Sequence, residues 1–596
     1  MNQPTAVSLT TVAEAYLAAL ALRGVDWLFS NAGTDFAPLI EALARAQTGA
    51  FAAPRAVAVP HEVVAVGMAH GYWMVTGRPQ AVMVHVDVGV ANALVGVMNA
   101  ARSRAPLLFT SGRTPFTESG HRGSRDLPIH WGQEMRDQGA LVREHVKWEH
   151  ELVFGDQVDL VVDRALAIAA AAPRGPVYLS LPRETLAAPW GNAALASATA
   201  QSTPSAARPD PAAIERAADL IAAARQPLII SAAFTTGAGL VLGAFADRFA
   251  IPVVEQWSPT NAIATDHPMH AGFDPGELLS EADVVLVLDV PVPWVPSRQR
   301  PAAGAAVIQI GPDPNFVDLP LRGHPAALAI TSAVEPALES LGAALDRRLR
   351  QGATAQDRHP RASGATASSI PSPLRSRHDE LSRRIAASRE RHRARAGALD
   401  SPPAPAATKA WVSRHLERAI APELAEGRAW LFHELGCDPS VMRFPKPDTL
   451  FGLSIAGALG WALPAALGAQ LAARDQLVVA AVGDGSYTFA NPVACHQMAA
   501  QLDLPVLTVV FDNQGWQAVR MATLAIYPQG QAAQAAEMPL TSLAPSPNYA
   551  KVVEASGGHG ERVDDPSGFP AALARALDVV RRQRRQALVQ VRLPLG

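Results

Sequence analysis

The chain has 596 residues, 49% of them hydrophobic and 18% charged, so it is long enough for three or four domains with buried cores. Its formal charge is −3, from 51 Lys and Arg against 54 Asp and Glu, which argues against a nucleic-acid partner. Its only cysteines, Cys437 and Cys495, have neither disulfide-framework nor metal-site spacing, and no signal peptide is recognisable; both features favour a cytoplasmic protein.

Residues 1–188 alternate between short apolar runs and helix-length segments. A capping box at Thr11 to Glu14 predicts a helix that ends near Gly24, and 61–76 and 90–102 are further helix-length stretches. Strands are expected at 25–29, 56–59, 81–86, 106–110 and 176–180. Strands that alternate with helices indicate a parallel sheet covered on both faces.

The alternation of strands and helices stops after the first domain and resumes in a second domain. Residues 196–209 are rich in Ser, Thr, Ala and Pro and predict a linker. A second α/β domain is expected over 209–346, and its strands are expected at 227–231, 251–255, 283–289 and 305–310. Residues 351–408 are rich in Arg, Ala, Ser and Pro, which predicts a mobile or surface-draped connector with one basic helix near 377–396. The sequence suggests no function for this connector.

A third α/β domain is expected over 409–596. It contains 23 uncharged residues, 451–473, which is long enough to cross a bilayer. The segment is dominated by Ala and Gly, however, and Pro464 interrupts it. A buried loop and helix are therefore expected here, and no membrane association.

Two strand ends in this domain carry oxygen ligands. One apolar run leads into Gly483-Asp484-Gly485, and after a gap of 26 residues another leads into Asp512-Asn513-Gln514-Gly515. The carboxyl ends of neighbouring parallel strands open onto one crevice. Asp484 and the amide oxygen of Asn513 suit Mg²⁺, and the glycines allow backbone N–H groups to approach a diphosphate.

This arrangement resembles the signature of thiamine-diphosphate enzymes, although the family usually has Asn where this chain has Asp512. With the three α/β units, it resembles the acetohydroxyacid synthase, pyruvate oxidase and benzoylformate decarboxylase group. The resemblance implies three doubly wound parallel-sheet domains, of which the first binds the pyrimidine and the last the diphosphate. It also implies that these two domains come from different subunits of a homodimer or homotetramer.

The resemblance assigns several residues to the cofactor. The carbonyl of Gly515 would join Asp484 and Asn513 around the metal, and the other cofactor contacts would come from Gly485, Ser486 and Trp516.

Two further roles concern the cofactor's pyrimidine and its bent shape. A carboxylic acid must hydrogen-bond to N1′ of the pyrimidine, and Pro60-His61-Glu62 matches the family motif that gives this role to Glu62. Residues 456–460 match the segment that bends the cofactor, with the carbonyl of Gly457 and the side chain of Leu459 under the bend. Leu459 could also be an ordinary core residue.

Substrate groups follow from the same resemblance. His85 lies where benzoylformate decarboxylases carry a catalytic histidine, and Thr34 lies where they place a serine on the substrate carboxylate. Gln133 lies in a segment similar to one in acetohydroxyacid synthases and pyruvate oxidases. A structural histidine, a helix cap and an exposed loop glutamine are the alternatives. Ala518 and Val519 would leave room for an aryl or branched substrate.

The implied activity is that of a lyase or carboligase that decarboxylates a 2-oxo acid, or cleaves or forms a 2-hydroxy ketone, through a thiamine-bound enamine. An acetolactate synthase that acts on pyruvate is the first alternative, and a non-catalytic nucleotide-binding scaffold is the second. The segment Asp289 to Trp294 lacks the arginine of flavin-binding relatives, so FAD is not expected. The second histidine of benzoylformate decarboxylases is also absent from this region.

Overall fold

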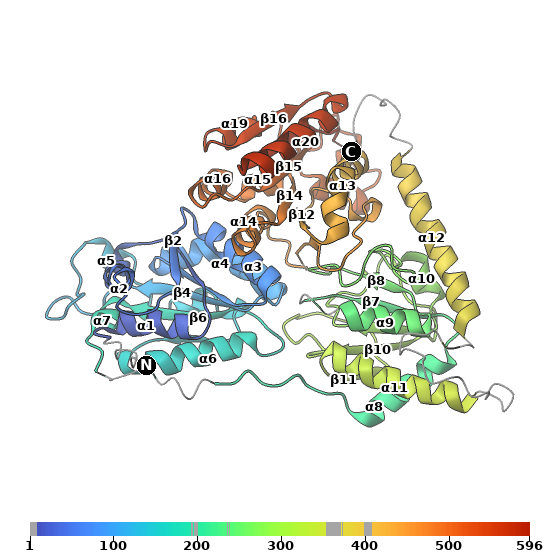
Figure 1. The fold of residues 1–596 in the computed structure, drawn as a ribbon, viewed down its shortest axis with the longest axis horizontal. Helices are drawn as coiled ribbons and strands as arrows, with labels where there is room; N and C mark the ends of the chain where they lie inside the picture. The colour runs from blue at the N-terminus through green and yellow to red at the C-terminus, as the bar shows by residue number, and fades with distance from the viewer. Residues whose placement is uncertain are drawn as a thin grey trace, which may run out of the picture.

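The computed structural model describes residues 9–191, 195, 201–234, 237, 239–352, 371, 374–397, 408–453 and 455–595. Three parallel sheets, each with helices on both faces, make up three α/β units (Figure 1). The predicted fold class is therefore confirmed. Part of the expected linker, 196–200, lies outside the described residues, as does much of the expected connector.

The first sheet has the strand order β2-β1-β3-β4-β6-β5, and every pairing is parallel. The strands are β1 (Trp27–Ser30), β2 (Arg55–Ala58), β3 (Gln80–Val84), β4 (Leu107–Arg113), β5 (Glu149–Glu151) and β6 (Val177–Pro182). Successive residues of a strand point to opposite faces, so Leu28 packs with α1 (Val12–Leu22) and α6 (Val158–Ala170), and Phe29 packs on the other side. That other side is covered by α3 (Glu62–Thr76) and α4 (Val86–Arg102). Further helices in this unit are α2 (Ala37–Gln47), α5 (Ile129–Gly132) and α7 (Arg183–Ala187).

The middle sheet has the order β11-β10-β9-β7-β8. Its strands are β7 (Pro227–Ser231), β8 (Val253–Glu255), β9 (Val284–Leu288), β10 (Ala306–Gly311) and β11 (Leu328–Thr331). Three helices pack on one face, α8 (Pro211–Ala223), α9 (Gly239–Phe249) and α11 (Val334–Gly352). The short helix α10 (Gly276–Glu281) packs on the other face through Leu279.

The third sheet has the order β13-β12-β14-β15-β17-β16. Its strands are β12 (Ala429–Glu434), β13 (Leu450–Phe451), β14 (Leu477–Gly483), β15 (Leu507–Asp512), β16 (His559–Val563) and β17 (Ala587–Arg592). One face packs against α13 (Lys409–Glu426) and α20 (Phe569–Asp578). The other packs against α14 (Ala462–Ala472), α16 (Pro492–Gln501) and α19 (Tyr549–Glu554). Three further helices are α15 (Asp484–Phe489), α17 (Gln517–Ile526) and α18 (Gln531–Gln534).

The first and third units meet where α3 packs against α14, and their apolar residues form one continuous core. Glycines allow this close approach. A Cβ atom added at Gly71 would lie 1.9 Å from the carbonyl oxygen of Ala465, and one at Gly468 would lie 1.9 Å from the carbonyl oxygen of Met68. The uncharged segment 451–473 thus forms the expected loop and buried helix. Of the helices described, none combines the length and the apolar character that a bilayer crossing requires.

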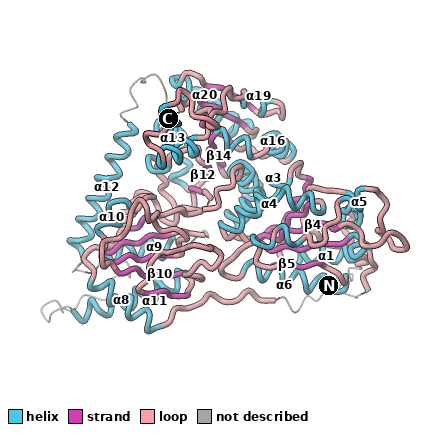
Figure 2. The backbone as a smooth tube through the Cα atoms, turned by 180° about the vertical axis from the view of Figure 1, so that it is seen from behind, coloured by secondary structure: helices cyan, strands magenta, loops and turns pink. Residues whose placement is uncertain are grey.

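The basic helix of the connector is α12 (Arg375–Gly397), which lies alongside both the middle and the third unit (Figures 1 and 2). His378 Nε2 lies 2.8 Å from Asp247 Oδ1, and Arg389 donates to the carbonyl of Thr265 at 2.6 Å. The helix also packs against α13. This part of the connector is therefore docked on the surface; residues 353–370, 372–373 and 398–407 lie outside the described residues.

Candidate active site

His85 occupies the turn between β3 and α4, at the carboxyl end of the first sheet. Its Nδ1 is hydrogen-bonded to the carboxylate of Asp35. Two glycines make room for this pair. A Cβ atom at Gly33 would lie 2.0 Å from His85 Nδ1, and one at Gly112 would lie 1.4 Å from Asp35 Oδ2. Val86, the next residue, has a φ of +26°, which is strained for a β-branched residue and is typical of functional turns.

The surroundings of His85 raise its pKa. Burial by itself lowers it, but the hydrogen bond to Asp35 and the charge of that carboxylate outweigh burial, and Gln133 and Asp87 add to the increase. The side chain of Gln133 forms a hydrogen bond with the His85 ring, and its Oε1 atom is shielded from solvent. The ring therefore keeps its proton to higher pH than an ordinary histidine, with a buried amide oxygen beside it.

A second histidine lies in the same cluster. His130 of α5 is buried, and its Nε2 lies 3.4 Å from the hydroxyl of Thr34. Burial and then the charge of Arg183 lower the pKa of His130, which favours a neutral ring. The structure thus brings together Thr34, His85 and Gln133, whose predicted roles toward the substrate stay predictions.

Sequence reasoning missed two members of this cluster, Asp35 and His130. Their positions offered a signal, because Asp35 directly follows Thr34 and His130 precedes Gln133 by three residues.

Glu62 is the first residue of α3, and His61 caps that helix. The Glu62 side chain is 12% exposed, and its Oε2 accepts a hydrogen bond from the side chain of Asn92 on α4. Asn92 follows His85 by seven residues, which corresponds to about 10 Å along a helix. Glu62 and His85 therefore lie near the same stretch of α4, about two turns apart.

The segment predicted to bend the cofactor also lies against α4. Asn99 donates to the carbonyl of Ala458 at 2.8 Å, and it follows Asn92 by another two turns. Within that segment, Gly457 is exposed with a φ of +70°, and Leu459 is partly buried. The first and third units thus face each other within one chain. A second contact between them joins Asn491 Nδ2 and His61 Nδ1, which lie 3.4 Å apart. Whether subunits share the cofactor site, as the resemblance implies, stays a prediction.

Glu434, at the end of β12, was not predicted from the sequence. Its buried carboxylate accepts three successive backbone N–H groups, from Gly460 at 2.6 Å, Trp461 at 2.7 Å and Ala462 at 2.8 Å. Burial raises the pKa of Glu434, and these N–H donors partly offset the increase. The carboxylate fixes the segment of Gly457 and Leu459 to the third sheet. An acid that ends an apolar strand was the available signal.

Asp484 follows β14 at the carboxyl end of the third sheet. Its Oδ1 accepts a hydrogen bond from Gly485 N at 2.9 Å, while its Oδ2 is buried and has no partner among the described residues. Burial raises the pKa of Asp484 to about 6, and the charge of Asp512 contributes. An unsatisfied, buried carboxylate oxygen is costly unless it meets a cation, so the position fits a divalent metal.

Asp512, the departure from the family pattern, has hydrogen-bond donors from the protein on both of its carboxylate oxygens. Its two oxygens accept from Ser546 Oγ at 2.6 Å, Gln590 Nε2 at 2.8 Å, Gln514 N at 3.2 Å and Arg592 at 3.3 Å. It therefore has a structural partner set of its own. Asn513, the next residue, has its Oδ1 near Gly515 N at 3.2 Å and remains the better second ligand for a metal.

The remaining predicted residues surround this turn. A Cβ atom at Gly485 would lie 2.3 Å from the ring of Trp516, which also packs edge-to-face against Phe489 at 5.8 Å. Trp516 is thus a packing residue of the Asp484 turn, and Ser486 is buried beside it. Ala518 and Val519 lie on α17 and are exposed, Val519 to 48%. A single chain does not enclose them in a pocket.

Comparison with known families covers all three units. The N-terminal TPP binding domain of thiamine pyrophosphate enzymes matches residues 10–141, the central domain matches 214–341, and the C-terminal TPP binding domain matches 435–591. The chain belongs to the thiamine pyrophosphate enzyme family. The predicted family and the predicted enzyme type, a thiamine-dependent decarboxylase or carboligase, are confirmed.

Several curated relatives of this thiamine pyrophosphate enzyme align over most of its length. A probable 2-ketoarginine decarboxylase of Pseudomonas aeruginosa is 28% identical over 87% of this chain and 85% of its own. The benzoylformate decarboxylase of the same species is 25% identical over 86% and 88%. A sulfoacetaldehyde acetyltransferase of Rhodobacter capsulatus is 27% identical over 95% and 92%.

Solved structures show the same fold. A 4-hydroxybenzoylformate decarboxylase from Rhodococcus jostii superposes with a TM-score of 0.73 at 22% identity, over 98% of this chain and 99% of that one. A benzoylformate decarboxylase from Polynucleobacter necessarius superposes with a TM-score of 0.74 at 21% identity, over 99% of each chain.

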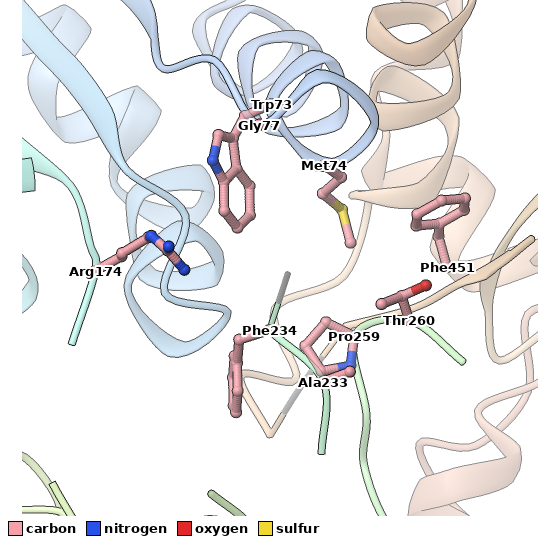
Figure 3. Close-up of a pocket in the computed structure, with 9 residues that line it drawn as sticks. All are labelled: Trp73, Met74, Gly77, Arg174, Ala233, Phe234, Pro259, Thr260 and Phe451. Atoms are coloured by element: carbon pink, nitrogen blue, oxygen red, sulfur yellow. The ribbon is translucent and has the colours of Figure 1, made fainter. Parts of the chain in front are cut away.

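This thiamine pyrophosphate enzyme also has a cavity of about 260 Å³ where its three units meet (Figure 3). Trp73 and Met74 project into it from α3, opposite Phe234 and Pro259 of the middle unit. None of the predicted site residues lines this cavity. It is therefore separate from the candidate active site.

Proposed function

We propose that this chain is a thiamine-diphosphate- and Mg²⁺-dependent decarboxylase of a 2-oxo acid that releases an aldehyde. One observation carries the proposal: His85, whose pKa is raised by Asp35, lies about two helical turns from Glu62 along α4. A proton donor at the start of α4 and a carboxylic acid at the start of α3 are thus held along α4, the second through its contact with Asn92. These are the two protein groups that thiamine-dependent decarboxylation needs.

When bound, thiamine diphosphate supplies a nucleophilic carbon and an electron sink, so that CO₂ can leave a 2-oxo acid. Glu62 would hold the pyrimidine through N1′, with Asn92 orienting its carboxylate. Gly457 and Leu459 would support the bent cofactor, and Glu434 keeps their segment in place.

We propose that Mg²⁺ binds at the Asp484 turn. The unpartnered Oδ2 of Asp484 supports this assignment, and the amide oxygen of Asn513 and the carbonyl of Gly515 would complete the protein ligands. Gly485 and Ser486 lie beside this ligand set. Bound FAD is not expected.

The substrate would bind beside His85. Thr34 would contact its carboxylate, and Gln133 would contact its carbonyl or the product oxygen. Ala518 and Val519 would accommodate an aryl or branched group, which agrees with the aryl 2-oxo acid in the name of the benzoylformate decarboxylase relative. The 2-ketoarginine decarboxylase relative indicates a longer, basic alternative.

Carboligation is the second candidate. The buried amide of Gln133 beside His85 favours it, because this amide could orient a second carbonyl compound. The acetyltransferase relative also supports group transfer to an acceptor.

A panel of 2-oxo acids tests the proposal. Benzoylformate, 2-ketoarginine and pyruvate would be supplied to the full chain with and without thiamine diphosphate and Mg²⁺, and CO₂, aldehyde, acetoin and acetolactate would be measured. We expect cofactor-dependent aldehyde release from one of the larger acids. Acetolactate from pyruvate alone would support the synthase alternative. Tight binding of a dinucleotide without any turnover would support a scaffold.

Assembly and location are part of the proposal. Sedimentation of the holoenzyme is expected to give the mass of a homodimer or homotetramer. The apolar residues exposed on α17, Val519, Met521 and Ile526, support such an interface. Both cysteines are unpaired and buried, which agrees with a cytoplasmic location.

A further inference from the structure

The contact between His85 and Asp35 is built by several elements. Asp35 lies in the short helix Thr34–Phe36 after β1, and His85 follows β3. The Asp35 side chain is 3% exposed and that of His85 16%. Gly33 and Gly112 border the pair closely, because a Cβ atom at Gly33 would overlap His85 and one at Gly112 would overlap Asp35. The pair is therefore enclosed, and its geometry is set by the backbone.

We propose that Asp35 is a positioning residue that holds the His85 ring through Nδ1, so that Nε2 delivers the proton that replaces CO₂ in the aldehyde product. This inference rests on the proposed decarboxylase function and extends it to a residue that no sequence motif indicated. Asp35 would favour protonation to an aldehyde over transfer to a second carbonyl compound.

The proton balance is simple. The 2-oxo acid anion loses CO₂, and the electron pair of the broken C–C bond takes the Nε2 proton to form the aldehyde C–H bond. His85 is left neutral, with its Nδ1 proton still donated to Asp35, and it regains a proton at Nε2 from water. The sum is one 2-oxo acid anion and one proton converted to one aldehyde and one CO₂.

The charged groups around the ring agree with this role. Asp35 from the helix after β1 and Asp87 from α4 both raise the pKa of His85. His130 from α5 lies close enough to interact electrostatically with His85, and burial together with Arg183 and other charges lowers its own pKa, which limits repulsion. Only Asp35 combines its charge with a hydrogen bond to the ring.

A chemical titration tests the proposal without substrate. Diethylpyrocarbonate reacts with neutral imidazole, so its rate of reaction at His85, followed by mass spectrometry of the His85 peptide over pH, reports the pKa of that ring. In the full-length holoenzyme we expect a midpoint above the ordinary value of about 6.5. Asp35→Asn should lower the midpoint by about one pH unit or more, because it removes a charge and a hydrogen bond. The matched control Asp87→Asn removes an equal charge without a ring contact and should lower the midpoint less.

A second measurement follows the chemistry. In Asp35→Asn the pH profile of aldehyde release should move to lower pH, with about a tenfold loss of rate at alkaline pH for every pH unit by which the midpoint falls. A larger share of carboligation product is expected alongside. A wild-type midpoint at or below the ordinary histidine value, or equally lowered midpoints in Asp35→Asn and Asp87→Asn, would overturn the role of Asp35. The wild-type midpoint can overturn the role of Asp35 even if Asp35→Asn does not fold. If no 2-oxo acid is turned over, the proposed function fails, whereas the titration still reports on the pair.

Discussion

His85 at the carboxyl end of the first sheet and Asp484 at the carboxyl end of the third sheet differ in the partners that the protein gives them. In the first unit, His85 has its partner inside the protein, because Asp35 engages its Nδ1. In the third unit, Asp484 keeps one buried oxygen without any partner among the described residues. The difference agrees with the roles proposed for the two residues. A group that transfers protons needs a fixed tautomer and a tuned pKa, whereas a group that binds a metal must leave an oxygen unsatisfied until the metal arrives.

A similar contrast exists between neighbouring strands of the third sheet. The Oδ2 atom of Asp484, after β14, has no hydrogen-bond partner among the described residues. Asp512, at the end of β15, accepts hydrogen bonds from Ser546, Gln590 and Arg592. Two adjacent carboxylates thus have separate tasks. One is available to a ligand, and the other stabilises the turn that presents Asn513.

The largest expected effect tests Glu62, the acid of the first unit that is proposed to hold the pyrimidine of the cofactor. Glu62→Gln should lower turnover by about 10² to 10⁴, because the amide cannot donate a proton to the pyrimidine nitrogen. Thiamine diphosphate binding, measured by tryptophan fluorescence, should change much less. Glu41→Gln, on the exposed side of α2, serves as the control. Full turnover in Glu62→Gln would contradict the assignment.

The next effect tests Asp484 of the third unit, whose Oδ2 atom has no hydrogen-bond partner among the described residues. Asp484→Asn should weaken Mg²⁺-dependent binding of thiamine diphosphate by about 100-fold or more, measured by calorimetry. The cofactor-free protein should lose no thermal stability, because the substitution removes a buried charge whose Oδ2 atom has no hydrogen-bond partner among the described residues.

Its matched variant, Asp512→Asn, should behave in the opposite way. The unfolding free energy is expected to fall by about 1–3 kcal/mol, because buried donors lose a charged acceptor. Cofactor affinity should fall less than in Asp484→Asn. Equal losses of affinity in the two variants would remove the distinction between the two carboxylates.

A further test concerns the contact that brings the two units together. Gly71→Ala should lower the unfolding free energy in urea by about 1–3 kcal/mol, because the added Cβ would lie 1.9 Å from a carbonyl oxygen of α14. Gly323→Ala, where a Cβ would meet nothing within 4 Å, is expected to be close to neutral. Unchanged stability in Gly71→Ala would show that α3 and α14 are not packed as described.

The smallest effect concerns the support of the cofactor-bending segment. Glu434→Gln keeps the shape of the side chain but weakens the hydrogen bonds from Gly460, Trp461 and Ala462, so the unfolding free energy should fall by about 1 kcal/mol. The Michaelis constant for the cofactor should rise as the segment loosens. A variant with wild-type stability and cofactor affinity would argue against a supporting role.

Most central strands could be predicted from the sequence, and so could the edge strands β2 and β8, whereas the edge strands β5 and β16 could not. Runs such as Leu228 to Ile230 are apolar without interruption because both faces of a central parallel strand are covered. The edge strands β5 and β16 read Glu-His-Glu and His-Gly-Glu-Arg-Val, and solvent on one side removes the apolar signal. Boundaries of the domains and roles of the site residues remain predictions that the variants above address.

The sequence by itself determined the three α/β units, the family, and the positions of Glu62, His85 and Asp484 at strand ends. These features can be recognised from neighbouring residues, because a strand followed by a glycine turn or by the start of a helix is a pattern of consecutive residues. Only the tertiary structure decided the partners: Asp35 for His85, Asn92 for Glu62, and Arg592 for Asp512. Such pairs join residues that are 30 to 80 positions apart, and whether a buried charge is satisfied depends on what the fold places beside it.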